Sequence, residues 1–158
     1  MTPAARRLFF LYAHPCTEVL VSMRKHTRKQ MLGIRKAALR KDYSTSAFFF
    51  PTASREIAKL AGNKKVDARL VRRYFLEEHD RIVRERGADW RVCVVWPAKV
   101  IATNGSNARV RTPLGEKNVN IDFCPCKKGD LVTVHYNHAC EQITSREFER
   151  LNKRKLVK

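Results

Sequence analysis

The fold of the second half is decided by residues 104–112, which read Asn104-Gly105-Ser106-Asn107-Ala108-Arg109-Val110-Arg111-Thr112. Ala108, Val110 and Thr112 alternate with Arg109 and Arg111, and this two-residue period is typical of a half-buried strand. The Asn-Gly segment before it suits a tight turn, because these residues tolerate positive φ. We therefore predict a strand over 108–112 that leaves a turn at 104–107.

The same alternation recurs on both sides of this stretch. It predicts further strands over 92–96, 119–123 and 131–136, with turns at 113–115 and 127–130. Four or five short strands with such brief connections close best into a small barrel. The segment Thr144-Ser145-Arg146-Glu147 then has the pattern of a capping box, so we expect a last helix that packs Phe148 and Leu151 against the barrel.

The first half has helical periodicity instead. Apolar residues from Leu8 to Met23 recur at three- and four-residue steps, with a break expected at Pro15. A basic helix is predicted over Arg24–Lys41 and a short one near Ser54–Ala61. A longer helix should begin after Asp67 as its cap and end at Gly87. The spacing within it predicts exposed acid-before-base pairs of Glu77 with Arg81 and of Asp80 with Arg84.

These patterns predict an α+β protein with two domains. An all-helical domain with a helix-turn-helix core should occupy residues 1–88, and an OB-like β-barrel with a C-terminal helix should occupy residues 89–158. The period changes at Gly87-Ala88-Asp89, which we take as the joint between them. The second half is thus expected to hold the sheet and the first half only helices.

The net charge indicates polyanionic partners. The 158 residues carry 33 Lys and Arg against 15 Asp and Glu, a net charge of +18, and residues 1–90 hold +11 of it. Nucleic acid is the first candidate for such a surplus and an anionic membrane the second. Five cysteines, an odd number, favour a reducing compartment, so we expect a cytoplasmic protein. No apolar run is long enough to span a membrane.

One candidate nucleic-acid contact is a helix-turn-helix over residues 56–74. The small Ala58 would let two helices cross closely, and Gly62 would permit the turn between them. The second helix would then present Arg69, Arg72 and Arg73 to bases or phosphates. The alternative is structural, because any three-helix bundle contains two helices joined by a glycine turn. We favour nucleic-acid contact over this alternative because the segment is so basic.

A second candidate contact is the basic helix over 24–41. Like charges four residues apart repel one another, so an anionic partner such as the phosphate backbone would reduce the repulsion within the helix. A membrane surface suits it less well because its apolar seam is narrow. The basic residues that we expect to contact nucleic acid here are Arg24, Lys25, Arg28, Lys29, Arg35 and Lys36.

Two segments of the second half carry a family resemblance. The first is Val92-Cys93-Val94-Val95-Trp96-Pro97-Ala98-Lys99-Val100, and the second runs from Gly129-Asp130-Leu131 through Val134-His135 to Glu141-Gln142-Ile143. Together they resemble the HypC/HupF hydrogenase assembly chaperones over about residues 91–152. The resemblance implies a small OB-like barrel with a terminal helix, and a protein partner for it. It does not cover residues 1–90, which resemble only a generic helix-turn-helix module.

The resemblance also implies an iron-carrying cysteine. In the family, a cysteine after the initiator methionine holds iron with cyanide and carbonyl ligands, and a histidine lies nearby. By position these residues are Cys93 and His135, although here a whole domain precedes the cysteine. A thiolate is a soft ligand for low-spin iron, and an imidazole can coordinate or hydrogen-bond it. The alternative for Cys93 is a buried thiol in a strand.

Other side chains give weaker signals. Cys124-Pro125-Cys126 has a spacing too short for the usual zinc knuckle, and no catalytic constellation stands out. Trp96 or Tyr136, if exposed, could stack on bases. We therefore expect a non-enzymatic protein without a cofactor that binds DNA or RNA through its basic helical module. The alternative is an accessory protein of [NiFe]-hydrogenase maturation that carries iron on Cys93 and His135. No membrane partner is expected.

Overall fold

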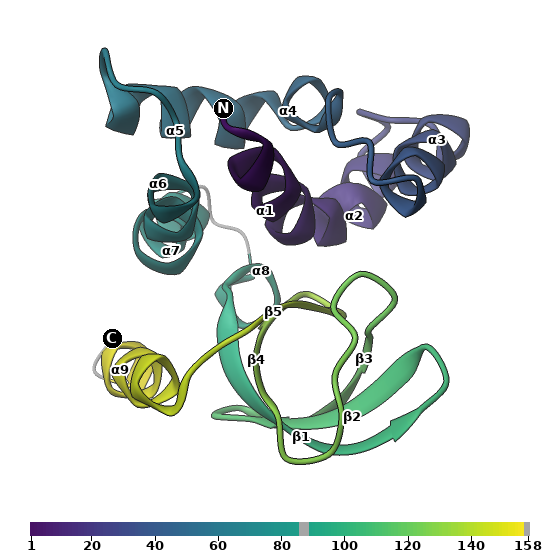
Figure 1. Cartoon of the computed structure of the whole chain (residues 1–158), viewed down its shortest axis with the longest axis vertical. Coiled ribbons are helices and arrows are strands. Elements are labelled where there is room, and N and C mark those ends of the chain that lie inside the picture. The colour runs from purple at the N-terminus through teal and green to yellow at the C-terminus, as the bar shows by residue number, and fades with distance from the viewer. Residues whose placement is uncertain (86–88, 157–158) are drawn as a thin grey trace. The chain divides into compact units, whose positions relative to one another are not determined.

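The computed structural model describes residues 1–85 and 89–156, and it divides into two compact units, Met1–His79 and Asp80–Lys158 (Figure 1). A helical N-terminal region is followed by a closed five-strand barrel and a C-terminal helix, so the predicted α+β class is confirmed. The predicted joint at Gly87-Ala88 and the predicted helix end at Gly87 lie outside the described residues. The predicted boundary between residues 88 and 89 therefore stays a prediction, and each unit is described by itself.

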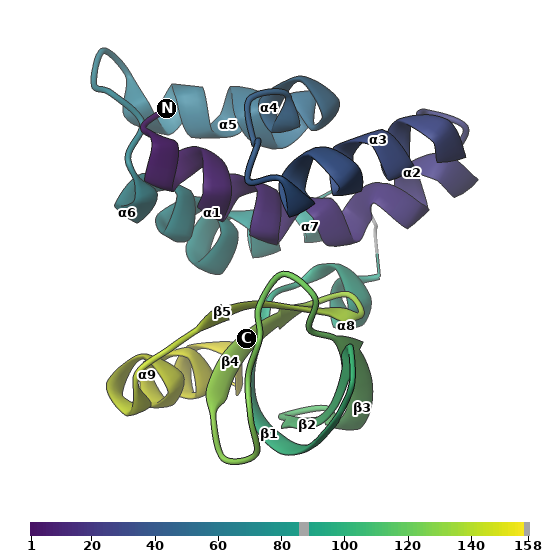
Figure 2. The ribbon, with the colours of Figure 1, turned by 45° about the vertical axis from the view of Figure 1, so that its right-hand side comes forward.

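The first unit contains only helices (Figures 1 and 2). They are α1 (Pro3–Ala13), a 3-10 turn (His14–Cys16), α2 (Thr17–Ser22), α3 (Arg28–Leu39), α4 (Ser46–Phe49), α5 (Pro51–Ala61), α6 (Ala68–Arg73) and a π turn (Tyr74–Glu78). The helical chain continues into α7 (His79–Glu85). Thus the predicted break at Pro15 is confirmed as a short turn between α1 and α2.

The core of this unit is aromatic. Phe9 and Tyr12 of α1 are fully buried and both contact Phe75, with ring centroids 6.0 and 5.1 Å apart. Tyr74, Phe75 and Leu76 are consecutive and all buried. The π turn at this point lets three successive side chains face inward, which a regular helix would spread over more than half its circumference.

The predicted basic helix over 24–41 is wrong at its start. Arg24 has a φ of +55°, and the backbone N–H groups of Lys25 and His26 both donate to the carbonyl of Leu20, which ends α2. Helix α3 then begins after Thr27, whose hydroxyl accepts from the Gln30 N–H while the Gln30 side chain accepts from the Thr27 N–H. Arg24 and Lys25 consequently lie in a turn rather than on a helix face.

The barrel has the strand order β1-β2-β3-β5-β4. Its strands are β1 (Trp96–Asn104), β2 (Asn107–Thr112), β3 (Gly115–Asn120), β4 (Leu131–His135) and β5 (His138–Gln142). The alternation predicted over 108–112 is confirmed, since Ala108, Val110 and Thr112 are buried and the arginines between them are exposed. The barrel closes through a single parallel pairing of Asn120 with His138, whereas all its other strand pairs are antiparallel.

The predicted strand over 92–96 is also wrong at its start. Residues Trp90–Cys93 form a short helix, α8, and β1 begins only at Trp96. Asp89 accounts for this, because its carboxylate accepts from the Arg91 N–H at 3.0 Å and its carbonyl accepts from the N–H groups of Val92 and Cys93. A capped helical turn therefore precedes the barrel.

The last helix, α9 (Ser145–Leu156), begins as predicted. The Thr144 N–H donates to the Glu147 carboxylate at 2.9 Å, and the Glu147 N–H donates to the Thr144 hydroxyl at 3.2 Å. Leu151 is buried on this helix. Among the described residues, no helix is both long and apolar enough to cross a membrane.

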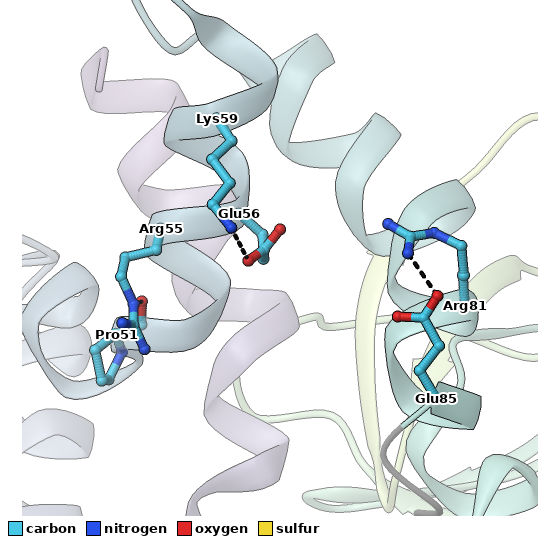
Figure 3. Close-up of polar contacts among 6 residues, drawn as sticks. All are labelled: Pro51, Arg55, Glu56, Lys59, Arg81 and Glu85. Atoms are coloured by element: carbon cyan, nitrogen blue, oxygen red, sulfur yellow. Dashed lines mark hydrogen bonds and ion pairs between the residues drawn. The ribbon is translucent and has the colours of Figure 1, made fainter.

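Ion pairs differ between exposed helix faces and the interior. On helix faces, Lys59 pairs with Glu56 at 2.9 Å and Arg81 with Glu85 at 2.6 Å (Figure 3). By contrast, Asp80 of α7 is buried and forms an ion pair with the buried Lys155 of α9. The predicted exposed position of Asp80 is therefore wrong, because a partner 75 residues away along the chain takes its carboxylate into the interior.

Candidate functional site

Cys93 is the last residue of α8 and lies at the edge of the barrel. It is half-buried and packs against a small apolar cluster formed by Val83, Val94 and Trp96. Each of these three residues is less than 10% exposed. Cys93 is thus neither a strand residue nor a fully buried one, and its environment is supplied by α7, the segment after α8 and β1.

Two ring N–H groups hold the end of α8. The Nε2 atom of His135 lies 2.9 Å from the carbonyl oxygen of Cys93, and the Nε1 atom of Trp96 donates to the carbonyl of Arg91 at 3.0 Å. A carbonyl can only accept, so Nε2 of His135 carries the proton. These bonds satisfy carbonyls that a helix leaves unpaired at its C-terminal end.

The structure therefore brings the two predicted site residues together. His135 is the last residue of β4 and is fully buried, and its hydrogen bond uses the main chain of Cys93 rather than the thiol. Since Nε2 is engaged in this way, His135 in this conformation fixes the backbone that carries the thiol. We regard it as a positioning residue for Cys93, and its predicted role as an iron ligand stays untested.

Trp96 donates a structural hydrogen bond that the sequence patterns did not predict. Its exposed fraction is 5% and its indole N–H is used internally, so it cannot serve as the exposed base-stacking platform considered from the sequence.

Tyr136 is half-buried and has a φ of +55° in the turn between β4 and β5. The Lys117 ammonium donates to the Tyr136 carbonyl, and burial lowers the pKa of Lys117. The preference of Asp for helix N-caps, at Asp89, is the sequence signal that could have revealed α8.

The remaining cysteines of the barrel unit do not add ligands to this site. Cys124 and Cys140 are buried and Cys126 is half-buried. Burial, followed by the charge of Asp130, raises the pKa of the Cys126 thiol. In the part of the chain that the structure describes, no group of three or more His, Cys, Asp or Glu could hold a metal ion. The candidate site therefore consists of Cys93 and the histidine that binds its main chain.

The predicted helix-turn-helix residues lie around α5 and α6. Asp67 caps α6 as predicted, accepting from the Leu70 N–H at 2.9 Å, and this hydrogen bond lowers the pKa of its carboxyl. Ala58, however, is exposed, so it does not lie at a close helix crossing, and the buried residues of α5 are Ile57 and Ala61. The turn contains Gly62 with a φ of +55°. A helix pair is present, but the close contact at Ala58 that motivated the motif is absent.

The predicted nucleic-acid contacts fall on two separate helices and a turn. Arg69 pairs with Asp67 at 3.4 Å and Arg73 with Glu78 at 3.6 Å, while Arg72 is half-buried. Arg69 and Arg73 line one shallow hollow of about 390 Å³, together with Lys64 and Lys65. On α3, Arg28, Lys29 and Lys36 are exposed and Arg35 is half-buried. The prediction of DNA or RNA binding by these residues stays a prediction.

Comparison with known proteins bears on the barrel unit. The model of the HupF/HypC family matches residues 92–153, which run from α8 through the five strands into α9. A search of curated proteins found no match for the chain. The matched range includes both Cys93 and His135, and the match supports a maturation-type barrel domain. Residues 92–153 therefore match the HupF/HypC family, in agreement with the resemblance described from the sequence for residues 91–152.

Proposed function

We propose that this protein is a non-enzymatic accessory protein of [NiFe]-hydrogenase maturation that carries an iron fragment on Cys93. The observation that supports this is the hydrogen bond of 2.9 Å from His135 Nε2 to the Cys93 carbonyl, within the segment that matches the HupF/HypC family. The histidine is fully buried, so this hydrogen bond ties a buried ring nitrogen to the main chain of the candidate cysteine. Iron is here the cargo and not a resident cofactor.

The two residues have different roles in this proposal. Cys93 supplies a thiolate, which is a soft ligand suited to low-spin iron. His135 holds the main chain of Cys93, and its hydrogen bond fixes where the thiolate points. Trp96 does the same two residues earlier, at the carbonyl of Arg91. The iron fragment would therefore be bound by one protein sulfur and by the small ligands it brings with it.

A cargo held by a single thiolate has to be received from one protein and passed to another. Cys93 is half-buried, so a partner protein can reach its thiolate. That partner would cover the thiolate during transfer. We accordingly propose that the barrel binds protein partners of the hydrogenase maturation pathway. A reducing compartment would keep the thiol available, so we propose the cytoplasm as its location.

The test is anaerobic purification of the full chain from a host that makes a [NiFe]-hydrogenase. Iron content is measured by mass spectrometry, and cyanide and carbonyl ligands by their infrared stretching bands. We expect iron and both sets of bands in the wild type and neither in Cys93→Ser. The matched control is Cys126→Ser, which removes another half-buried thiol of the same unit and should retain both signals.

The His135→Gln variant separates positioning from ligation. An amide side chain can still donate to the Cys93 carbonyl but is a poor iron ligand, so a positioning role predicts retained iron. Iron lost in His135→Gln would instead assign ligation to the histidine. Wild-type protein that contains no iron, or iron that persists in Cys93→Ser, would contradict the proposed function.

A further inference from the structure

Helix α3 contains a short heptad pattern on its outer face. Its sequence reads Arg28-Lys29-Gln30-Met31-Leu32-Gly33-Ile34 and then Arg35-Lys36-Ala37-Ala38-Leu39. The set Arg-Lys-x-x-Leu thus occurs twice, seven residues apart, as Arg28, Lys29 and Leu32 and as Arg35, Lys36 and Leu39. Seven residues are close to two helical turns, so each member lies above its counterpart, about 10.5 Å along the axis.

The leucines of this pattern are exposed. Leu32 is 51% exposed and Leu39 is 67% exposed. Met23 and Phe48, which are 57% and 84% exposed, flank α3 in sequence. Among the described residues, four of the five exposed large apolar side chains thus lie between residues 23 and 48, and the fifth is Leu114 of the barrel.

The outer face is not needed to hold α3 in place. Ile34 and Ala38 are its buried residues, and α3 lies beside α2 in both views of the unit (Figures 1 and 2). On the helical wheel, Leu32 and Leu39 point at least 100° away from Ile34 and Ala38. The leucines therefore contribute little to folding, and their exposure calls for another explanation.

Three of the cations beside these leucines have no ion-pair partner among the described residues. Arg28, Lys29 and Lys36 are exposed, and within residues 1–85 and 89–156 none of the three forms an ion pair with a carboxylate. In contrast, Lys59, Arg69 and Arg73 of the same unit each have an acidic partner. The surface is consequently a narrow apolar seam bordered by unpaired positive charge.

We propose that this outer face of α3 is a docking surface for an acidic amphipathic helix of a partner protein. Leucines at seven-residue spacing with flanking charges of one sign form the pattern that one helix presents to another of opposite charge. A phosphate backbone would use the cations but would leave Leu32 and Leu39 without a partner. A membrane surface would require a wider apolar face than two leucines provide. This proposal concerns the helical unit and does not rest on the cysteine site.

The test uses a synthetic peptide of roughly three heptads, with leucine at positions a and d and glutamate at e and g. The glutamates prevent the peptide from pairing with itself. Binding of the fluorescently labelled peptide to the full chain is measured by anisotropy at several salt concentrations. We expect a micromolar dissociation constant that weakens with salt, and no comparable binding of a scrambled peptide of the same composition.

The leucine and lysine contributions are measured separately. Leu32→Ala with Leu39→Ala should weaken peptide binding about tenfold or more, because truncating buried anchors typically has such an effect. The matched control is Leu114→Ala, an exposed leucine of the barrel that should leave binding unchanged. Lys29→Gln with Lys36→Gln should weaken binding and reduce its salt dependence, whereas the control Lys64→Gln with Lys65→Gln should do neither.

Two further probes test nucleic acid and membrane as other partners of this surface. A duplex DNA of about two helical turns and vesicles rich in phosphatidylserine are titrated against the wild type and the double leucine variant. The proposal is overturned if the leucine substitutions leave peptide binding intact, or if the scrambled peptide binds equally well. It is also overturned if the vesicles, and not the peptide, require the leucines. Cys93→Ser should bind the peptide normally, so failure here is distinguishable from failure of the proposed cysteine function.

Discussion

Helix α3 and the barrel unit use charge in opposite ways. In the barrel unit, Asp80 and Lys155 form a buried ion pair, and Glu116 lies 2.7 Å from Arg111 and 3.9 Å from Arg109 across two neighbouring strands. On α3, the exposed Arg28, Lys29 and Lys36 have no such partner within residues 1–85 and 89–156. The difference teaches that these paired charges of the barrel unit serve the fold, whereas the exposed charge on α3 is available to another molecule.

The largest expected effect follows from breaking the buried pair. Asp80→Asn leaves Lys155 charged and buried without its counterion, so we expect the free energy of unfolding to fall by about 3–5 kcal/mol. The measurement is urea unfolding of the full chain at neutral pH. The double variant Asp80→Asn with Lys155→Met should recover much of the loss, because it removes the stranded charge as well.

The matched control for this pair is Glu116→Gln. It removes an exposed carboxylate from two cross-strand arginines and should cost at most about 1 kcal/mol. Equal losses for Asp80→Asn and Glu116→Gln would mean that the Asp80–Lys155 pair is not shielded from water. In that case the barrel unit would differ from α3 in the number of its ion pairs and not in the burial of one of them.

A second prediction concerns a group in the helical unit that burial keeps uncharged. Burial raises the pKa of the Cys16 thiol from 9.0 to about 12. Because the folded pKa is above the unfolded one, this contribution to stability is complete below pH 9 and is lost as the pH rises toward 12. We expect the free energy of unfolding to fall by about 1 kcal/mol between pH 7 and pH 10 from this thiol alone.

Comparison of the wild type with Cys16→Ala isolates that slope. The variant should show a smaller alkaline loss in urea unfolding between pH 8 and pH 10, while the difference between the two proteins should be constant from pH 6 to pH 8. Parallel curves across the whole range would show that Cys16 ionises as easily in the folded chain as in the unfolded one.

The smallest expected effect is a gain in the free energy of unfolding. The first turn of α3 contains no acidic residue, and an exposed acid there interacts favourably with the helix macrodipole. Lys29→Glu should therefore raise the free energy of unfolding by about 0.3–0.5 kcal/mol while abolishing peptide binding on this face. Lys64→Glu, in the turn after α5, controls for the general relief of positive charge. If both variants gain equally, the position within α3 is irrelevant to stability.

Much of the barrel was predictable because its signals are local. The alternation over 108–112, the glycine turn at Gly105 and the capping box of Thr144 with Glu147 each involve residues within a few positions of one another. Strand β5 was missed because the turn before it uses Tyr136 at positive φ, and a tyrosine gives no turn signal. Residues 92 and 93 have strand-forming side chains, but the Asp89 cap overrides that preference.

The candidate site was predictable only in part. The pairing of Cys93 with His135 came from the family resemblance and not from periodicity, since the two residues lie on different elements. Their actual link, through the Cys93 carbonyl, depends on α8 and could not be read from spacing. Asp80 was misplaced for a similar reason, because helical register describes one helix and its partner Lys155 lies on another.

The single parallel pairing between β3 and β5 has a consequence for how the chain folds. Strands β1, β2 and β3 are joined by tight turns, as are β4 and β5, so each set can pair through contacts near in sequence. The pairing of Asn120 with His138 instead spans residues 121–137. The pairing of β1 with β4 closes a longer stretch still, from Lys99 to Leu131. Contacts that close longer loops form later. Both pairings should therefore follow the local ones, and His135 should reach its place beside the Cys93 carbonyl only in this late step of barrel closure.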